Sequence, residues 1–137
     1  MSVFEGQCHC GAVAARFETP AAPEAIDVRA CQCSFCRRHG AKTVGDPDGR
    51  LTLRFREADV ARYRFGTGTS DFIVCKHCGA FAAATIEGFA VLNVVGMAIA
   101  ALAAREARPV DYDSETPAAR LERRGARWTP LVVELAA

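Results

Sequence analysis

Several short segments of the chain alternate apolar and polar residues, the pattern of a strand with one buried face. The clearest is LTLRF at residues 51–55, where Leu51, Leu53 and Phe55 fall on one side. The residues around these segments are rich in glycine, proline and aspartate, which are typical of turns. We expect further strands at residues 3–11, 12–19, 26–33, 71–75, 80–88 and 89–96.

Signals for helices are few. Residues 34–41, SFCRRHGA, predict a single helical turn that ends at Gly40. The run from 89 to 104 is apolar except for Asn93, but its 16 residues fall short of the ~20 that span a bilayer. This apolar run therefore predicts a buried strand followed by an alanine-rich core helix. Residues 108–130 are mostly polar, so the expected fold class is mainly β with two short helices.

Length and composition narrow the possibilities further. The 137 residues suit one domain covering 1–137, and half of the residues are apolar, enough for a core. A domain of this size is stabilised considerably by a bound metal. Seventeen basic and 16 acidic residues leave a net charge of +1. This balance argues against nucleic acid or an anionic membrane as the partner.

Cysteine is the residue type with the most chemical information. The seven cysteines are an odd number, and the start MSVFEGQC lacks the charged and apolar regions of a secretory signal. A disulfide framework in an exported protein is therefore disfavoured. We expect a cytoplasmic protein, with no membrane partner, whose thiols bind a metal or react.

The cysteines form three groups whose spacing suits tetrahedral zinc. Zn–S bonds of ~2.3 Å place two thiolate sulfurs ~3.8 Å apart, a separation that Cys-x-x-Cys and Cys-x-Cys segments provide. The middle three cysteines can reach one metal unaided, and the two outer pairs together supply four ligands. We predict a closed structural zinc site and a second, open and labile zinc site. The ligands are Cys8, Cys10, Cys75 and Cys78 in the first site, and Cys31, Cys33 and Cys36 in the second.

Alternatives remain for both groups and for their neighbours. Cys75 and Cys78 alone would also suit a redox pair. The middle three cysteines would also suit a second structural zinc completed by a neighbour such as His39, or a thiol cluster without metal. Arg37 and Arg38 follow this cluster directly. They form a solvated charge pair, offset thiolate charge, or hold a substrate carboxylate.

Three motifs occur together in a fixed order: GQCHCGAV at 6–13, CQCSFCRRHGA at 31–41 and VCKHCGA at 74–80. In this combination the chain resembles the glutathione-dependent formaldehyde-activating enzyme family, which includes centromere protein V. The resemblance covers about residues 5–112 and leaves the tail, 113–137, outside.

The resemblance implies a β-tent fold of antiparallel sheets stapled by zinc. It implies a structural zinc on the four outer cysteines and a catalytic zinc on the middle three. The named activity of the family joins glutathione to formaldehyde, giving S-(hydroxymethyl)glutathione, and is classed as a carbon–sulfur lyase. Glutathione, or another small thiol, and an aldehyde are the partners that it implies.

The open site suggests how such a reaction runs. A thiol that binds a metal loses its proton, and the thiolate can attack an aldehyde carbon; the reverse step cleaves the C–S bond. Arg37, Arg38 and His39 are the candidates for holding the substrate. His39 and Asp71 are candidates for the general acid.

Two other classes of function remain open. One is a non-catalytic zinc scaffold or thiol carrier. The other is a nucleic-acid-binding zinc module, for which the tail offers a basic and aromatic cluster. That cluster is more typical of a solvated helix face with one anchoring tryptophan. Its members are Arg120, Arg123, Arg124, Arg127 and Trp128.

Overall fold

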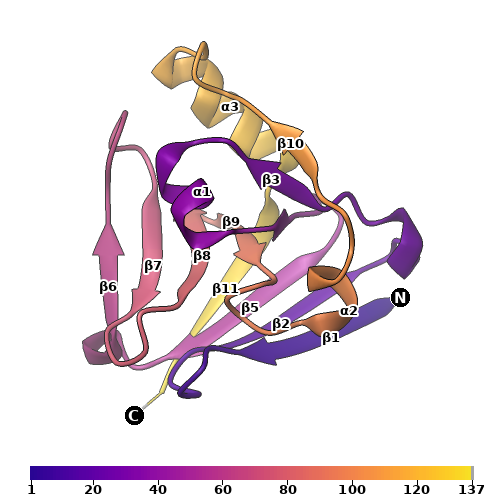
Figure 1. The fold of residues 1–137 in the computed structure, drawn as a ribbon, viewed down its shortest axis with the longest axis vertical. Helices are drawn as coiled ribbons and strands as arrows, with labels where there is room; N and C mark the ends of the chain where they lie inside the picture. Colours follow the sequence, from indigo (N-terminus) through magenta and orange to yellow (C-terminus); the bar gives the residue numbers. More distant parts are fainter. Residues whose placement is uncertain (137) are drawn as a thin grey trace.

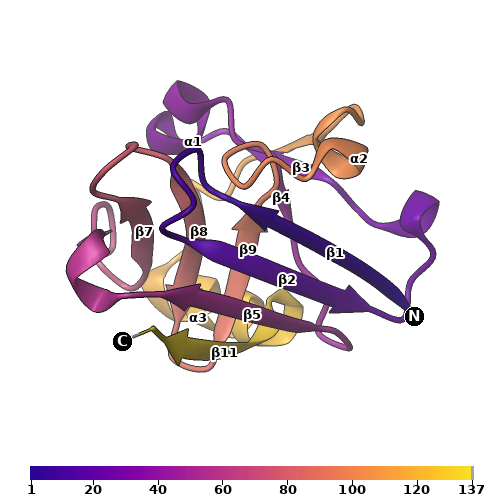
Figure 2. The ribbon, with the colours of Figure 1, turned by 90° about the horizontal axis from the view of Figure 1, so that it is seen from below.

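Residues 1–136, described here by a computed structural model, form a mainly β fold with eleven strands and three short helices (Figure 1). The predicted fold class is therefore confirmed, with one helix more than expected. One layer contains four strands, which run across the strands behind them in Figure 2. These are β1 (Ser2–Gln7), β2 (Ala14–Thr19), β5 (Arg50–Phe55) and β11 (Thr129–Leu135).

The second layer contains the other seven strands. β6, β7, β8 and β9 follow one another as antiparallel neighbours, with a bulge in the β7–β8 pairing. β11 connects the two layers, because it pairs with β5 on one side and with β9 on the other. The strands are β3 (Arg29–Cys31), β4 (Thr43–Val44), β6 (Val60–Tyr63), β7 (Asp71–Cys75), β8 (Phe81–Ile86), β9 (Phe89–Asn93) and β10 (Arg108–Val110).

Strand direction departs from the expected antiparallel sheets at two places. β11 runs parallel to β5, and β10 runs parallel to β3. Parallel neighbours need a long crossover rather than a tight turn. Both pairs meet this need because each is formed by a strand of residues 108–135 that returns to a strand far earlier in the chain. The other pairs are antiparallel, as expected.

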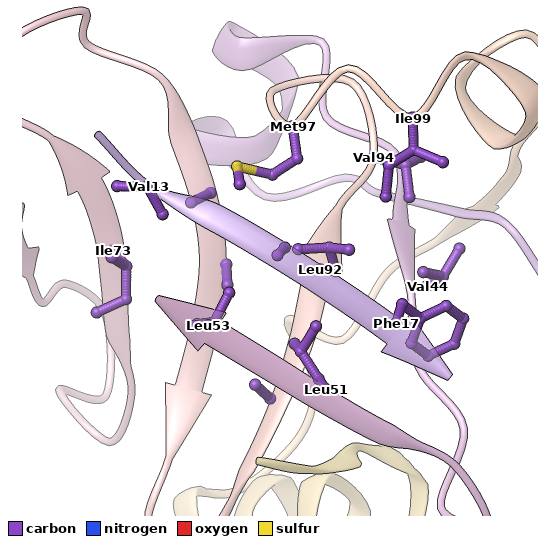
Figure 3. Packing of buried hydrophobic residues seen from close by; sticks show 14 of the residues in the cluster. Val13, Phe17, Val44, Leu51, Leu53, Ile73, Leu92, Val94, Met97 and Ile99 are labelled. Atoms are coloured by element: carbon purple, nitrogen blue, oxygen red, sulfur yellow. The ribbon is translucent and has the colours of Figure 1, made fainter. Parts of the chain in front are cut away.

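The main core lies between the two layers. Leu51, Leu53 and Phe55 of β5 are at most 1% exposed, which confirms the predicted buried face. Figure 3 shows Leu51 and Leu53 among side chains from both layers, including Phe17 of β2 and Leu92 of β9. Each such side chain contributes about 1.5–3 kcal/mol when it is buried.

The apolar run at 89–104 folds as β9, a series of turns and the four-residue helix α2 (Ala100–Ala103). The expected core helix is thus shorter than predicted, because Ala98 takes a left-handed φ of 55° and Met97 packs against β1. A Cβ at Gly6 of β1 would lie 2.1 Å from the Met97 carbonyl oxygen. Within residues 1–136, no helix is apolar and long enough to span a membrane.

The two other helices border the site described next. α1 (Ser34–His39) is the predicted single turn, and it ends at Gly40, which has a left-handed φ of 57°. α3 (Pro117–Arg127) begins at Thr116, whose side chain accepts a hydrogen bond from the backbone N–H of Ala119. Such a cap satisfies one of the free N–H groups of the first helical turn.

Candidate metal centres

Two turns, far apart in the sequence, bring the four outer cysteines together. Cys8 and Cys10 follow β1, while Cys75 ends β7 and Cys78 lies in the turn before β8. Each pair is followed by a glycine with positive φ, 83° and 78°. The N–H of that glycine donates to the carbonyl of the first cysteine, at 3.0 and 2.9 Å. The local turns therefore direct two thiols from each segment towards one point.

The separations of these sulfurs suit a metal ion. The four Sγ atoms all lie within 4.8 Å of one another. The Cys8–Cys10 distance is 3.8 Å and the Cys10–Cys75 distance is 3.5 Å, close to the ~3.8 Å of thiolates on tetrahedral zinc. A disulfide needs about 2.05 Å. The group could hold a metal ion, and its donor set is complete.

The middle three cysteines meet where β3 gives way to α1. Cys31 is the last residue of β3, Cys33 caps α1, and Cys36 is buried in its first turn. Their Sγ atoms also lie within 4.8 Å of one another, so this group, hereafter the cysteine trio, could hold a second ion. A small apolar cluster surrounds it. The buried members of that cluster include Ala41, Phe72, Phe81, Ala84, Val91 and Trp128.

The thiols of the cysteine trio strongly affect one another. Hydrogen bonds with Cys31, and to a smaller extent with Cys36, lower the pKa of the Cys33 thiol to about 2. The contacts with Cys31 and Cys33 raise the pKa of Cys36 well above its usual range. A negative charge is therefore concentrated on Cys33 and shared by its neighbours, an arrangement that attracts a cation.

A cavity of about 90 Å³ opens beside the cysteine trio and is bounded by all three of its residues. This volume is enough for several water molecules or the reacting end of a small ligand. One part of the wall is apolar and the other carries hydroxyl and charged groups. The apolar part includes Phe65, Phe72, Phe81, Val91, Val110 and Trp128.

Four arginines contribute to the charged part of the wall: Arg29 from β3, and Arg120, Arg123 and Arg124 from α3. Arg123 donates to both carboxylate oxygens of Glu115, at 2.8 and 3.0 Å. Arg120 lies 3.6 Å from the same carboxylate. The Arg123 hydrogen bonds are the largest cause of a lowered pKa of Glu115, which therefore stays ionised at neutral pH.

Arg124 is only 9% exposed, an uncommon position for a charged side chain. Its Nη1 donates to Thr69 Oγ1 at 3.1 Å, and its guanidinium lies over the ring of Trp128, 4.9 Å from the centroid. Burial lowers the pKa of Arg124 to about 10, so the group is still charged near pH 7. The cavity thus combines thiols, aromatic rings and cations.

The residues predicted to hold the substrate or to act as general acid are not among those that line the cavity. Arg37 and Arg38 are on the exposed side of α1, and neither lines the cavity. The His39 ring packs on Phe35, with 4.5 Å between the ring centroids. Asp71 is paired with two arginines of β6 and the following turn. None of these four residues lines the cavity, and their proposed roles stay predictions.

The basic and aromatic cluster of the tail, predicted to form a solvated helix face with one anchoring tryptophan, is partly buried. A solvated helix face is wrong for Arg124, while the anchoring role of Trp128, 5% exposed, is confirmed. Arg127 is exposed. The spacing of Arg120, Arg124 and Trp128 at intervals of four was the available signal, because it places all three on one side of a helix. A buried stripe of this kind offers little basic surface to nucleic acid.

Comparison with known proteins agrees with the geometry. The sequence matches the family described as glutathione-dependent formaldehyde-activating enzyme over residues 3–112, which confirms the resemblance inferred from the three motifs. The chain is also similar to a Rhodobacter sphaeroides protein whose crystal structure was a Northeast Structural Genomics target. The TM-score is 0.57 at 29% identity, over 77% of this chain and 99% of that one. This chain therefore belongs to the glutathione-dependent formaldehyde-activating enzyme family.

Proposed function

We propose that this protein is a zinc-dependent carbon–sulfur lyase-type enzyme. Its substrate is the adduct of a small thiol, glutathione by analogy with the family, and an aldehyde such as formaldehyde. The observation that carries this proposal is the position of Cys31, Cys33 and Cys36, clustered in the wall of a cavity. A metal site that opens on a cavity is typical of catalysis, whereas a closed four-ligand site is typical of structural zinc.

The donor sets fit zinc at both positions. Thiolate sulfur is a preferred zinc ligand, and the separations within both groups suit one ion each. The four outer cysteines would fill the coordination shell, while the cysteine trio leaves one position for a ligand. When bound at the trio, zinc supplies the positive charge that keeps a ligand sulfur ionised near neutral pH.

The residues of the chain orient and enclose the reacting groups. The rings of Phe72, Phe81 and Trp128 give the cavity beside the cysteine trio an apolar wall, so that a bound ligand displaces water from the reacting groups. In the synthetic direction, the ligand sulfur forms a bond with the aldehyde carbon, and the thiol proton ends on the aldehyde oxygen. Thr67 Oγ1 and Thr69 Oγ1, 2.8 Å apart in the cavity wall, could pass this proton on. The lyase direction reverses each transfer, and no electrons are gained or lost.

The test is zinc content together with glutathione-dependent consumption of formaldehyde. The wild-type protein should hold about two zinc ions, and Cys33→Ser should lose about one of them and lower the rate at least ~100-fold. Its far-UV circular dichroism should not change, since Cys33 is outside the four-cysteine group. The neighbouring, exposed Ser34 offers the matched control, and Ser34→Ala should behave like wild type.

Two results would contradict the proposal. If the wild-type protein holds both ions and consumes no formaldehyde with glutathione present, the lyase assignment is wrong. Tight binding of the thiol without turnover would then support the thiol-carrier alternative. If Cys33→Ser retains both zinc and activity, the cysteine trio is not the site.

A further inference from the structure

Two guanidinium groups in the cavity wall lack a carboxylate partner among residues 1–136. Arg29 makes no side-chain hydrogen bond within that part of the chain, and its Nε is buried without a partner. Arg124 donates through Nη1 to Thr69, but its buried Nε is also unpaired. Its guanidinium also lies over the face of the Trp128 ring. Both residues line the cavity, and apart from the Nη1 contact of Arg124 with Thr69 their Nη groups make no hydrogen bond within residues 1–136.

Such an arrangement is costly for the folded protein. A buried cation without a counter-charge loses its hydration and gains little in return. Buried arginine N–H groups in folded proteins nearly always have acceptors. Arg29, Arg120 and Arg124 are three exceptions in the wall of one cavity, and of these only Arg120 lies near a carboxylate of the described residues, that of Glu115. The counter-charge that Arg29 and Arg124 lack is one that a ligand can supply. Planar, bidentate donors of this kind match a carboxylate.

The charges of the wall lead to the same conclusion. Four arginines are opposed by two carboxylates, Asp113 in the wall and Glu115 behind it, which leaves an excess of two positive charges. Three thiolates around one dication carry a single negative charge. At least one positive charge therefore remains for an anionic group of the ligand.

The location of these arginines is also informative. Arg29 is two residues before Cys31 on β3, whereas Arg124 belongs to α3, beyond the residues matched by the family. Figure 1 shows α3 at the same end of the molecule as β3 and α1. One cavity is thus bounded by the cysteine trio and by a cationic wall that the matched segment alone does not complete.

We propose that Arg29 and Arg124 form a carboxylate-binding subsite for the ligand whose sulfur reaches the cysteine trio. The substrate class is then a thiol, or its aldehyde adduct, that carries at least one carboxylate. This inference rests on the proposed function for the sulfur end of the ligand. The arginines touch the substrate at its other end and select acids over neutral thiols.

The experiment is calorimetric titration of the zinc-loaded protein with three probes: glutathione, its diethyl ester and S-methylglutathione. Arg29→Gln and Arg124→Gln should each weaken glutathione binding about 10- to 100-fold, the effect of one charge-assisted contact. The diester should bind wild type and both variants equally weakly. Arg127→Gln, an exposed arginine one turn further along α3, should not change any affinity.

The outcomes separate the two proposals. If the diester binds wild type as tightly as glutathione, or if both arginine variants bind glutathione normally, the subsite is refuted while the lyase proposal stands. If Cys33→Ser binds glutathione normally but Arg124→Gln does not, the subsite is supported and the role of the cysteine trio is refuted.

S-methylglutathione, which lacks a free thiol, should still bind more weakly to Arg124→Gln than to wild type. Absence of that difference would overturn the subsite. Melting of Arg124→Gln verifies its fold, and it should be at least as stable as wild type, because a buried unpaired charge is removed.

Discussion

At the scale of single residues, Gly6 of β1 lies where no side chain fits. A Cβ there would lie 2.1 Å from the Met97 carbonyl oxygen and 2.7 Å from the Ile99 side chain. The backbone of one segment must move to accept it, so Gly6→Ala should lower the free energy of unfolding by about 1–3 kcal/mol. Urea unfolding of the zinc-loaded protein measures the change.

Gly125 provides the matched control for this substitution. It lies within α3, and a Cβ there would meet nothing within 4 Å. Gly125→Ala should raise the free energy of unfolding by about 0.5–1 kcal/mol, since alanine favours a helix. Equal effects of the two substitutions would show that crowding at Met97 is not what constrains Gly6.

The sequence predicts the cysteines at one end of the cavity, but not the arginines at the other end. The division of the cysteines into four and three follows from short-range spacing, and the structure brings both groups together. Arg29 and Arg124 are 95 positions apart, and only the tertiary fold places both of them in one wall. Arg37 and Arg38 are nearer to the cysteine trio in sequence, yet they lie on the outer side of α1.

At the scale of elements, the ion pair between Glu115 and Arg123 holds the start of α3 to its middle. The Arg123 hydrogen bonds lower the pKa of Glu115 from its usual value of 4.5 in the folded protein. The pair therefore stabilises the fold above pH 4.5, and this contribution is lost as the pH falls through the lowered pKa. Glu115→Gln should cost roughly 1 kcal/mol at pH 7 and progressively less as the pH falls below 4.5.

Thermal melting of wild type and Glu115→Gln between pH 7 and pH 3 tests this dependence. The difference between the two proteins should shrink as the pH falls. A difference that stays constant across the range would mean that the charge of Glu115 does not stabilise α3. Glu122→Gln, an exposed carboxyl on the same helix, is the control and should have little effect at any pH.

The elements that the sequence predicts best are those with clear alternation, such as β5, and the turn at α1. The strand expected at 26–33 is reduced to β3. Ile26 and Val28 are buried as predicted, but the segment that carries them lies outside any strand. α3 falls in a mostly polar stretch, where the interval of four between Arg120, Arg124 and Trp128 is the local signal. β11 is a short apolar run, and its place between β5 and β9 depends on the tertiary fold, which no local pattern reveals.

At the scale of the whole molecule, the two cysteine groups occupy different places in the fold, from which we predict different effects of metal loss. The four-cysteine group joins segments whose nearest contacting thiols, Cys10 and Cys75, are 65 residues apart. A structural zinc contributes on the order of 10 kcal/mol in small peptides. Cys75→Ser should therefore unfold the domain, whereas loss of metal from the cysteine trio should not.

Mild chelation should accordingly release zinc in two steps. The metal at the cysteine trio, which borders a cavity, should leave first while the fold is intact. The second should leave with unfolding. Zinc release measured with a chromophoric chelator, alongside far-UV circular dichroism, follows both steps. A single step in which all zinc leaves as the protein unfolds would contradict this division.

The order and direction of the strands in the sheet are the features that the sequence predicts least well. The mainly β class follows from alternation, but two parallel pairings depend on where residues 108–135 return in space. Sequence patterns describe faces of strands and not their neighbours. The mixed direction of the sheet is therefore known only from the structure.

The bridging position of β11 has a consequence for synthesis of the protein. Leu51 of β5 pairs with Leu131 of β11, which follows 80 residues later. At ~5–20 residues per second, the ribosome needs about 4–16 s to deliver the second strand after the first. During that interval one edge of β5 is open, and such an edge readily pairs with other chains. We expect slow translation between these two strands to favour aggregation of the nascent chain, and chaperones that cover strand edges to prevent it.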